Sequence, residues 1–294
     1  MSVHISNSKL KVTLKEMGGE LQSIQDESGL EYLWQGDPNY WPGQAPLLFP
    51  MCGSLRNNCA SLQDGRKVQM PRHGVVRGRE FELKESAEDS ATYSFHSDEE
   101  TKKQYPFDFL VENTYKLENN SILITHTVIN TDSKVLPFTI GAHPGFRCPL
   151  KENEAYEDYE VVFEQKETLD IPYQVLETAL VDRTRRTPFL ENEDHLSINH
   201  DLFKQDAIVL DKLKSKKVKL VSKKTGKGVE MQFDDFETLL IWGSRKGGDF
   251  VALEPWIGNS TYTDESDVFE EKESMKFLQP GERQSFSLRI TILN

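Results

Sequence analysis

Hydrophobic residues recur at every second position in several separate stretches of this chain. The alternation runs over residues 10–14, 111–117, 122–128, 229–233 and 286–292. A period of two places apolar side chains on one face of a β-strand and polar ones on the other, as antiparallel sheets allow. The stretches at 111–117 and 122–128 flank the turn-like Glu118-Asn119-Asn120, so we expect them to form a hairpin.

Sustained helical periodicity is hard to find. Residues 201–213 carry spaced apolar side chains that suit either a helix or a loop followed by a strand. The acidic clusters at 152–157 and 264–273 are interpreted as solvated loops. With no long linker and no internal repeat, we expect residues 1–294 to form one domain of the all-β class, a large antiparallel β-sandwich.

The composition narrows the choice of partners. The chain has 35 basic and 48 acidic residues, a net charge of −13. Nucleic acids and anionic membranes are therefore unsuited as main partners, because no basic excess displaces their counterions. No apolar run approaches the ~18 residues of a membrane helix, and the first residues do not resemble a secretory signal. We expect a cytoplasmic protein that acts on a small molecule; its oligomeric state is not predicted.

The cysteines do not suggest a disulfide framework or a metal site. Cys52, Cys59 and Cys148 are odd in number and lack the spacing of metal ligands. We expect free thiols and no metal or organic cofactor.

Two residues that close apolar strands are candidates for acid–base chemistry. His143 follows Phe138-Thr139-Ile140-Gly141, and histidine titrates near neutral pH. Glu254 follows Phe250-Val251-Ala252-Leu253, where partial burial favours its protonated form. The alternatives are a structural histidine bonded to backbone and an edge glutamate paired with an arginine. Trp256 adds a flat aromatic ring face of the kind that sugar rings pack against.

A second polar cluster surrounds His73. Arg72, Arg77 and Arg79 lie close to it in sequence, which suits an anion site, a polar pocket or a solvated turn. Asp206 is weak evidence alone, because the chain has many loop aspartates.

Taken together and in order, these clusters resemble the aldose 1-epimerase (galactose mutarotase-like) superfamily, and most closely its LacX-like branch. The specific pieces are Arg72-His73-Gly74 with Arg77, the segment Gly141-Ala142-His143-Pro144-Gly145-Phe146, and Leu253-Glu254-Pro255-Trp256. The resemblance covers nearly the whole chain and implies a large antiparallel β-supersandwich. This agrees with the period-two pattern.

The resemblance also implies a reaction, the interconversion of α and β anomers of a hexose without a cofactor. By this resemblance, Glu254 takes the proton of the anomeric hydroxyl and His143 protonates the ring oxygen. His73 matches a second histidine that polarises the ring oxygen, and Asp206 matches an aspartate that binds sugar hydroxyls. Opening a hemiacetal requires a base and an acid acting on two neighbouring oxygens.

One segment departs from the family pattern. Ser54 stands after Gly53, where an arginine is usual. Arg56 lies two residues further, and since residues two apart in an extended segment share a face, it is expected to reach the same pocket. A changed arginine contact would alter turnover or sugar preference.

Two alternative functions remain open at this point. A hexose-6-phosphate 1-epimerase would use Arg72, Arg77 and Arg79 for the phosphate, although the His143-Pro144-Gly145-Phe146 segment is more similar to the LacX-like branch. A non-catalytic sugar-binding or regulatory protein would have kept the pocket only. The presence of Glu254 and His143 argues against the latter, and Ser54 argues for it.

Overall fold

A computed structural model describes residues 2–294, and β-strands dominate it. About 51% of the chain is strand and 6% is helix. The prediction of an all-β antiparallel fold is therefore confirmed. The few helical segments are short: α1 (Glu99–Gln104), η1 (Arg56–Asn58), η2 (Tyr156–Asp158), η3 (His200–Phe203) and η4 (Phe269–Glu271).

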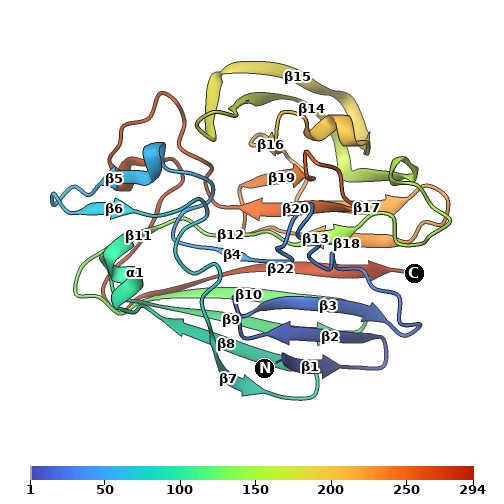
Figure 1. Ribbon diagram of the computed structural model, residues 1–294, viewed down its shortest axis with the longest axis horizontal. Coiled ribbons are helices and arrows are strands. Elements are labelled where there is room, and N and C mark those ends of the chain that lie inside the picture. The colour runs from blue at the N-terminus through green and yellow to red at the C-terminus, as the bar shows by residue number, and fades with distance from the viewer. Residues whose placement is uncertain (1) are drawn as a thin grey trace.

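The largest sheet has nine antiparallel strands and curves through most of the molecule (Figure 1). Its central hairpin is the one expected from the sequence, with Leu117 opposite Ile122. In spatial order the strands are β15 (Leu180–Ser197), β14 (Tyr159–Val175), β17 (Lys217–Ser222), β18 (Gly228–Gln232), β22 (Arg283–Leu293), β10 (Ser121–Asn130), β9 (Phe109–Glu118), β8 (Ser90–His96) and β7 (Glu82–Ser86).

A second, six-stranded sheet lies beside the β14–β15 end of the large sheet in Figure 1. Its path is β16 (Ile208–Leu210), β19 (Thr238–Trp242), β20 (Phe250–Trp256), β12 (Gly141–Ala142) and β4 (Leu47–Leu48), and β13 (Gly145–Arg147) also pairs with β20. All seven residues of β20 are buried, so this strand lies at the centre of the molecule.

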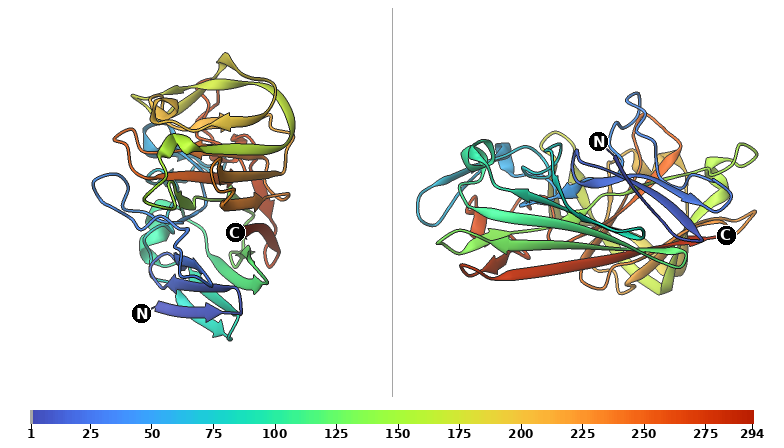
Figure 2. Two further views of the ribbon diagram at one scale, coloured as in Figure 1. Left: turned by 90° about the vertical axis from the view of Figure 1, so that its right-hand side faces the viewer. Right: turned by 90° about the horizontal axis from the view of Figure 1, so that it is seen from below.

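Three smaller sheets complete the fold. They are β1 (Ser2–Ser6) with β2 (Leu10–Lys15) and β3 (Glu20–Asp26), β5 (Cys59–Ser61) with β6 (Lys67–Gln69), and β11 (Leu136–Phe138) with β21 (Lys276–Leu278). Figure 2 shows the three-stranded sheet at one end of the molecule and the long hairpin of β14 and β15 at the other.

The hydrophobic core joins these sheets. One continuous cluster of buried side chains extends from Ile5 to Ile292 and draws residues from every sheet. On β20, Val251 and Leu253 point into this core. The alternate residues Phe250, Glu254 and Trp256 point to the opposite face of the sheet. Alternation along a buried strand therefore leaves Glu254 and Trp256 together on the face away from the main core.

The segment at 201–213 contains no α-helix. Its first part completes the short η3 turn, and its second part forms β16, which pairs with β19. Of the two structures that the sequence left open, the loop followed by a strand is the one observed.

Candidate active site

Three strands of the six-stranded sheet bring the predicted site residues together. On β19 and β20, Leu240 lies opposite Glu254 and Thr238 lies opposite Trp256. On the next strand, Gly141 lies opposite Trp256. A side chain at position 141 would collide with the indole, because an added Cβ would lie 2.6 Å from Cδ1 of Trp256. Glycine at this position therefore lets the Trp256 ring lie across β12.

His143 and Glu254 are in direct contact. His143 follows β12 directly, and its Nε2 lies 3.2 Å from Oε2 of Glu254. The histidine is 7% exposed and the glutamate 2%. The ring of His143 also stacks on Trp41, with ring centroids 4.7 Å apart. This stacking and the short contact fix the orientation of the imidazole toward the carboxyl group.

Burial shifts both pKa values of this pair toward the neutral forms. Burial raises the pKa of Glu254 well above its ordinary value, and Asp206 adds to the rise while Arg72 and Arg77 oppose it. Burial lowers the pKa of His143, and the same two arginines lower it further. The pair therefore holds a single proton over a wide pH range, and burial favours its position on Glu254. Such a pair can accept a proton at one oxygen of a ligand and donate a proton at a neighbouring one.

His73 is held as a neutral donor. Its Nδ1 accepts a hydrogen bond of 3.2 Å from the backbone N–H of Gly53, which leaves the proton of the neutral ring on Nε2. Burial lowers the pKa of His73 well below its ordinary value, and Arg72, His143 and Arg77 act in the same direction. The His73 and His143 rings meet edge to face with centroids 5.7 Å apart.

Asp206 lies in the turn before β16 and lines the same site. Its φ is +71°, and its Oδ2 accepts a hydrogen bond of 3.2 Å from Arg72. The arginine side chain is 38% exposed and the aspartate 20%, so this ion pair lies at the mouth of the site. A carboxylate held in this way keeps further acceptor positions for ligand hydroxyl groups.

These residues surround one cavity of about 200 Å³. Its walls combine titratable groups with apolar ones: Trp41, Arg72, His73, Arg77, His143, Asp206, Ala207, Leu240, Trp242, Glu254 and Trp256. The structure thus brings together six of the seven residues expected at the site: His73, Arg77, His143, Asp206, Glu254 and Trp256.

Trp41 and Trp242 also line the cavity, and the sequence analysis did not identify them. Trp41 lies in a loop far from the recognised segments, and Trp242 lies on a strand with no polar neighbour that would single it out. The two indoles meet edge to face with centroids 5.4 Å apart. Only the fold shows that these rings flank His143.

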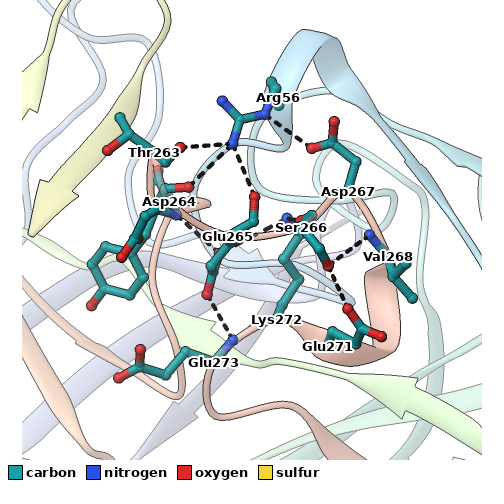
Figure 3. A network of polar contacts seen from close by, with 12 residues as sticks. Arg56, Thr263, Asp264, Glu265, Ser266, Asp267, Val268, Glu271, Lys272 and Glu273 are labelled. Carbon is teal, nitrogen blue, oxygen red and sulfur yellow. Dashed lines mark hydrogen bonds and ion pairs between the residues drawn. The ribbon is translucent and has the colours of Figure 1, made fainter.

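Arg56 is the residue that the structure does not bring to the cavity. Its Nε donates to Asp267, at 3.0 Å, and another guanidinium nitrogen donates to the backbone carbonyls of Tyr262, Thr263 and Glu265 (Figure 3). Leu55 has extended backbone, with φ of −81° and ψ of 152°, but Ser54 does not line the cavity and its backbone N–H donates to Ser260. The expectation for Arg56 was therefore wrong because the segment itself lies outside the cavity. Arg56 instead holds the loop 262–267.

Both acidic clusters are more than solvated loops. In the second, Lys272 is 5% exposed and donates to the carbonyl of Ser266 at 2.6 Å, beside Glu265 (Figure 3). In the first, Glu154 is 7% exposed and accepts hydrogen bonds from Ser222 and Thr225. The interpretation was wrong for Glu154, because specific donors compensate for its burial, and for Lys272, whose buried ammonium group is compensated by the acceptors Ser266 and Glu265.

Neither a cluster of metal-ligating side chains nor a membrane-spanning helix occurs among the described residues. Among residues 2–294, no group of three or more histidine, cysteine or acidic side chains is arranged to hold a metal ion. Over the same residues, no helix has both the length and the apolar character needed to cross a membrane. All three cysteines are free thiols, as expected.

Comparison with known proteins agrees with the fold. A model of the aldose 1-epimerase family matches residues 1–291. The chain therefore belongs to the aldose 1-epimerase family, whose members are carbohydrate enzymes.

Particular relatives place the chain more narrowly. It is 44% identical to the plasmid-encoded protein LacX of Lactococcus lactis subsp. lactis, over 100% of both chains. It resembles the structure of a galactose mutarotase related enzyme from Lactobacillus acidophilus, with a TM-score of 0.94 and 30% identity over 100% of this chain and 98% of the other. A galactose mutarotase-like protein from Lactobacillus casei gives a TM-score of 0.88 at 27% identity over 99% and 100%.

Proposed function

We propose that this protein is an isomerase that interconverts the α and β anomers of a free hexose. The observation that carries the proposal is the contact of 3.2 Å between His143 and Glu254 inside the buried cavity. The hydroxyl oxygen and the ring oxygen of a hemiacetal share one carbon atom, so a base and an acid must act within a few ångströms of each other.

The proposed reaction moves two protons and breaks one C–O bond. In the reactive form, the single proton of the pair has moved across the 3.2 Å contact from Glu254 to His143. Ionised Glu254 then takes the proton from the anomeric hydroxyl as the C1–O5 bond breaks, and protonated His143 donates its proton to O5. The open aldehyde then rotates about the C1–C2 bond. Ring closure on the other face returns the proton of O5 to His143 and the proton of Glu254 to the new anomeric oxygen. The pair ends with the protons it began with, and the sugar has the opposite anomeric configuration.

The other polar residues position the sugar in this proposal. The Nε2–H of His73 donates toward the ring oxygen, and the carboxylate of Asp206 accepts hydrogen bonds from hydroxyl groups. Trp256 offers its ring to the apolar face of the sugar. No metal is required, because both proton transfers use side chains of the chain itself.

The direct test is polarimetry on freshly dissolved α-anomers of several hexoses. The proposal predicts that the protein speeds the approach to the equilibrium rotation for at least one of them, and that exhaustive chelation does not remove this activity. Protein that binds a hexose without speeding its mutarotation would instead be a sugar-binding protein, which is the second class left open by the sequence.

Replacing Asp206 with asparagine should weaken sugar binding more than it slows turnover. The change removes a charged acceptor, and hydrogen bonds to charged groups contribute about 1.5–3 kcal/mol, so KM should rise at least about tenfold. Because Asp206 helps to raise the pKa of Glu254, the alkaline limb of the pH–rate profile should also move to lower pH. Asp201→Asn is the matched control, since Asp201 pairs with Lys204 on the surface nearby. Equal KM values for the two variants would show that Asp206 does not bind the sugar.

Hexose 6-phosphates should be poorer substrates than the free hexoses. Of the three arginines that could hold a phosphate, Arg72 is already paired with Asp206, and Arg79 does not line the cavity. Values of kcat/KM for matched pairs of free and phosphorylated sugars give the comparison. A strong preference for the 6-phosphate that disappears in Arg77→Ala would favour the phosphosugar epimerase instead.

A further inference from the structure

One ring nitrogen of His143 has no polar partner. Nε2 faces Glu254, but Nδ1 is buried and has no hydrogen-bond partner among residues 2–294. The backbone carbonyl of His143 opposes the lowering of its pKa, yet it forms no hydrogen bond with Nδ1. In the serine protease triad, by contrast, a carboxylate on the second nitrogen stabilises the protonated histidine. The positive charge that the proposed reaction places on His143 therefore needs stabilisation from another group.

The charged groups around the imidazole do not provide this stabilisation. The titratable and charged side chains that line the cavity with His143 are Arg72, His73, Arg77, Asp206 and Glu254. Burial lowers the pKa of His143 most, and the two arginines lower it further. The carboxylate of Asp206 is bound to Arg72 at the mouth of the site. Of the two carboxyl groups in the lining, only the one on Glu254 pairs with the imidazole.

The indole of Trp41 lies against the His143 ring. The two rings are stacked, with centroids 4.7 Å apart and planes inclined by 26°. Both side chains belong to residues that are only 7% exposed. The face of an indole attracts a cation within ~6 Å of its centroid, and the attraction grows when water is excluded. The contact therefore favours the protonated imidazole over the neutral one.

Two glycines make room for this contact. An added Cβ on Gly43 would lie 2.6 Å from Cζ2 of Trp41, and one on Gly145 would lie 2.7 Å from Cζ3. Gly145 is two residues after His143, so the segment that carries the histidine also leaves space for the indole. On the other side, the carbonyl of Asp37 accepts a hydrogen bond of 2.8 Å from the backbone N–H of Trp41. The stacked geometry is thus fixed by the backbone on both sides of the ring.

We propose that Trp41 stabilises the protonated form of His143 through its aromatic face and thereby makes the reactive form of the acid–base pair accessible. This proposal rests on the proposed function, in which a proton moves from Glu254 to His143 before the sugar ring opens. The indole forms and breaks no bond, so Trp41 is a positioning residue that acts through His143. Part of the positive charge has left the imidazole in the transition state, so the rate gains only part of this stabilisation.

Fluorinated tryptophans placed at position 41 test the proposal. Fluorine withdraws electron density from the face of the indole and leaves its shape and burial nearly unchanged. With the most heavily fluorinated ring, the pKa of His143 should fall by about 1, and kcat for anomer exchange should fall about three- to tenfold. Both changes should be graded with the number of fluorine atoms, while KM changes far less. Trp41→Leu would mix two opposite effects, because water admitted to the site raises the pKa of His143.

NMR of protein labelled with ¹⁵N-histidine measures the pKa without turnover. The imidazole nitrogen resonances move far on protonation, so a partial titration above the pH of acid unfolding is enough. The loss of one set of resonances in His143→Asn assigns them. If no hexose is turned over, a graded fall of the pKa would still support the contact between Trp41 and the imidazolium and would reject only the enzyme. A pKa that does not respond to fluorination would overturn the proposal whatever the activity.

Trp34 is the matched control. It is 8% exposed, its ring contacts Tyr40 and Phe250, and it does not line the cavity. The same fluorinated residues at position 34 should leave the pKa of His143 and kcat unchanged. Equal effects at both positions would overturn the proposal, and so would a rise of the pKa on fluorination of Trp41. In an active enzyme, a lowered pKa with unchanged kcat would also contradict it, because protonated His143 would then have no part in the rate.

Discussion

Replacing Glu254 with glutamine should lower kcat for anomer exchange by about 10²–10⁴-fold, the usual contribution of a general acid or base. Glutamine keeps the shape of the side chain and much of its hydrogen bonding, but it does not accept a proton at neutral pH. Sugar affinity should change far less, because Asp206 and Trp256 remain in place. Polarimetry gives the rate, and a fluorescence titration gives the affinity.

A second buried glutamate provides the control for folding. Glu167 is 1% exposed and accepts hydrogen bonds from Ser215, but it does not line the cavity. Glu167→Gln should keep kcat, whatever its effect on the thermal unfolding temperature. A folded Glu254→Gln protein that works at the full rate would show that Glu254 is not the base.

The pH profile should change in the same variant. In wild type, the active pair holds one proton, so kcat/KM falls below the lower pKa of the pair and above the upper one. Burial lowers the pKa of His143 and raises that of Glu254, which widens the plateau between these limbs. The alkaline limb follows the raised pKa of Glu254, since above it the pair has no proton left to donate. Glu254→Gln should remove the two-limbed profile from whatever activity remains.

Replacing His143 with asparagine should produce a loss of similar size. The amide keeps a polar group beside Glu254 but has no proton to transfer to the ring oxygen at neutral pH. The loss should appear in kcat, again about 10²–10⁴-fold, with a smaller change in sugar affinity. His126→Asn is the control, because His126 is buried and bonded to Asn113 but lies outside the cavity. A similar fall in kcat for His126→Asn would trace the loss to folding.

The double variant tests whether the two residues act in one step. If Glu254 and His143 act together, the combined change should reduce kcat by less than the product of the two single reductions. Multiplicative losses would mean that the two residues serve separate steps. The 3.2 Å between their side chains predicts the former.

The sequence allowed the fold class and most of the cavity to be predicted because both depend on local patterns. Alternation along β9, β10 and β22 shows one apolar face per strand, and that pattern survives in the sheet. Glu254 was identifiable because a carboxylate next to an apolar run must be compensated when it is buried. The direct contact between Glu254 and His143 could not be predicted from local patterns, because it depends on the pairing of β12 with β20.

Arg56 and the tryptophans show where local reasoning fails. The rule that residues two apart share a face says nothing of where that face points, and neither Ser54 nor Arg56 lines the cavity. The partners of Arg56, Asp267 and the carbonyls of loop 262–267, lie about two hundred residues away in the sequence. Trp41 carries no polar pattern that marks it, and its stacking on His143 follows from the tertiary fold alone.

The most direct test of the acid–base pair is exchange between the two anomers of a sugar at equilibrium, observed by NMR. Magnetisation transfer between the α and β anomeric protons reports ring opening and closure without any net change in the solution. With catalytic amounts of wild-type protein, the exchange rate should rise in proportion to protein concentration, and the Glu254→Gln, His143→Asn double variant should lower that increment by about 10²-fold or more. An increment that is absent in wild type for every hexose tested, or that the double variant retains in full, would contradict the account.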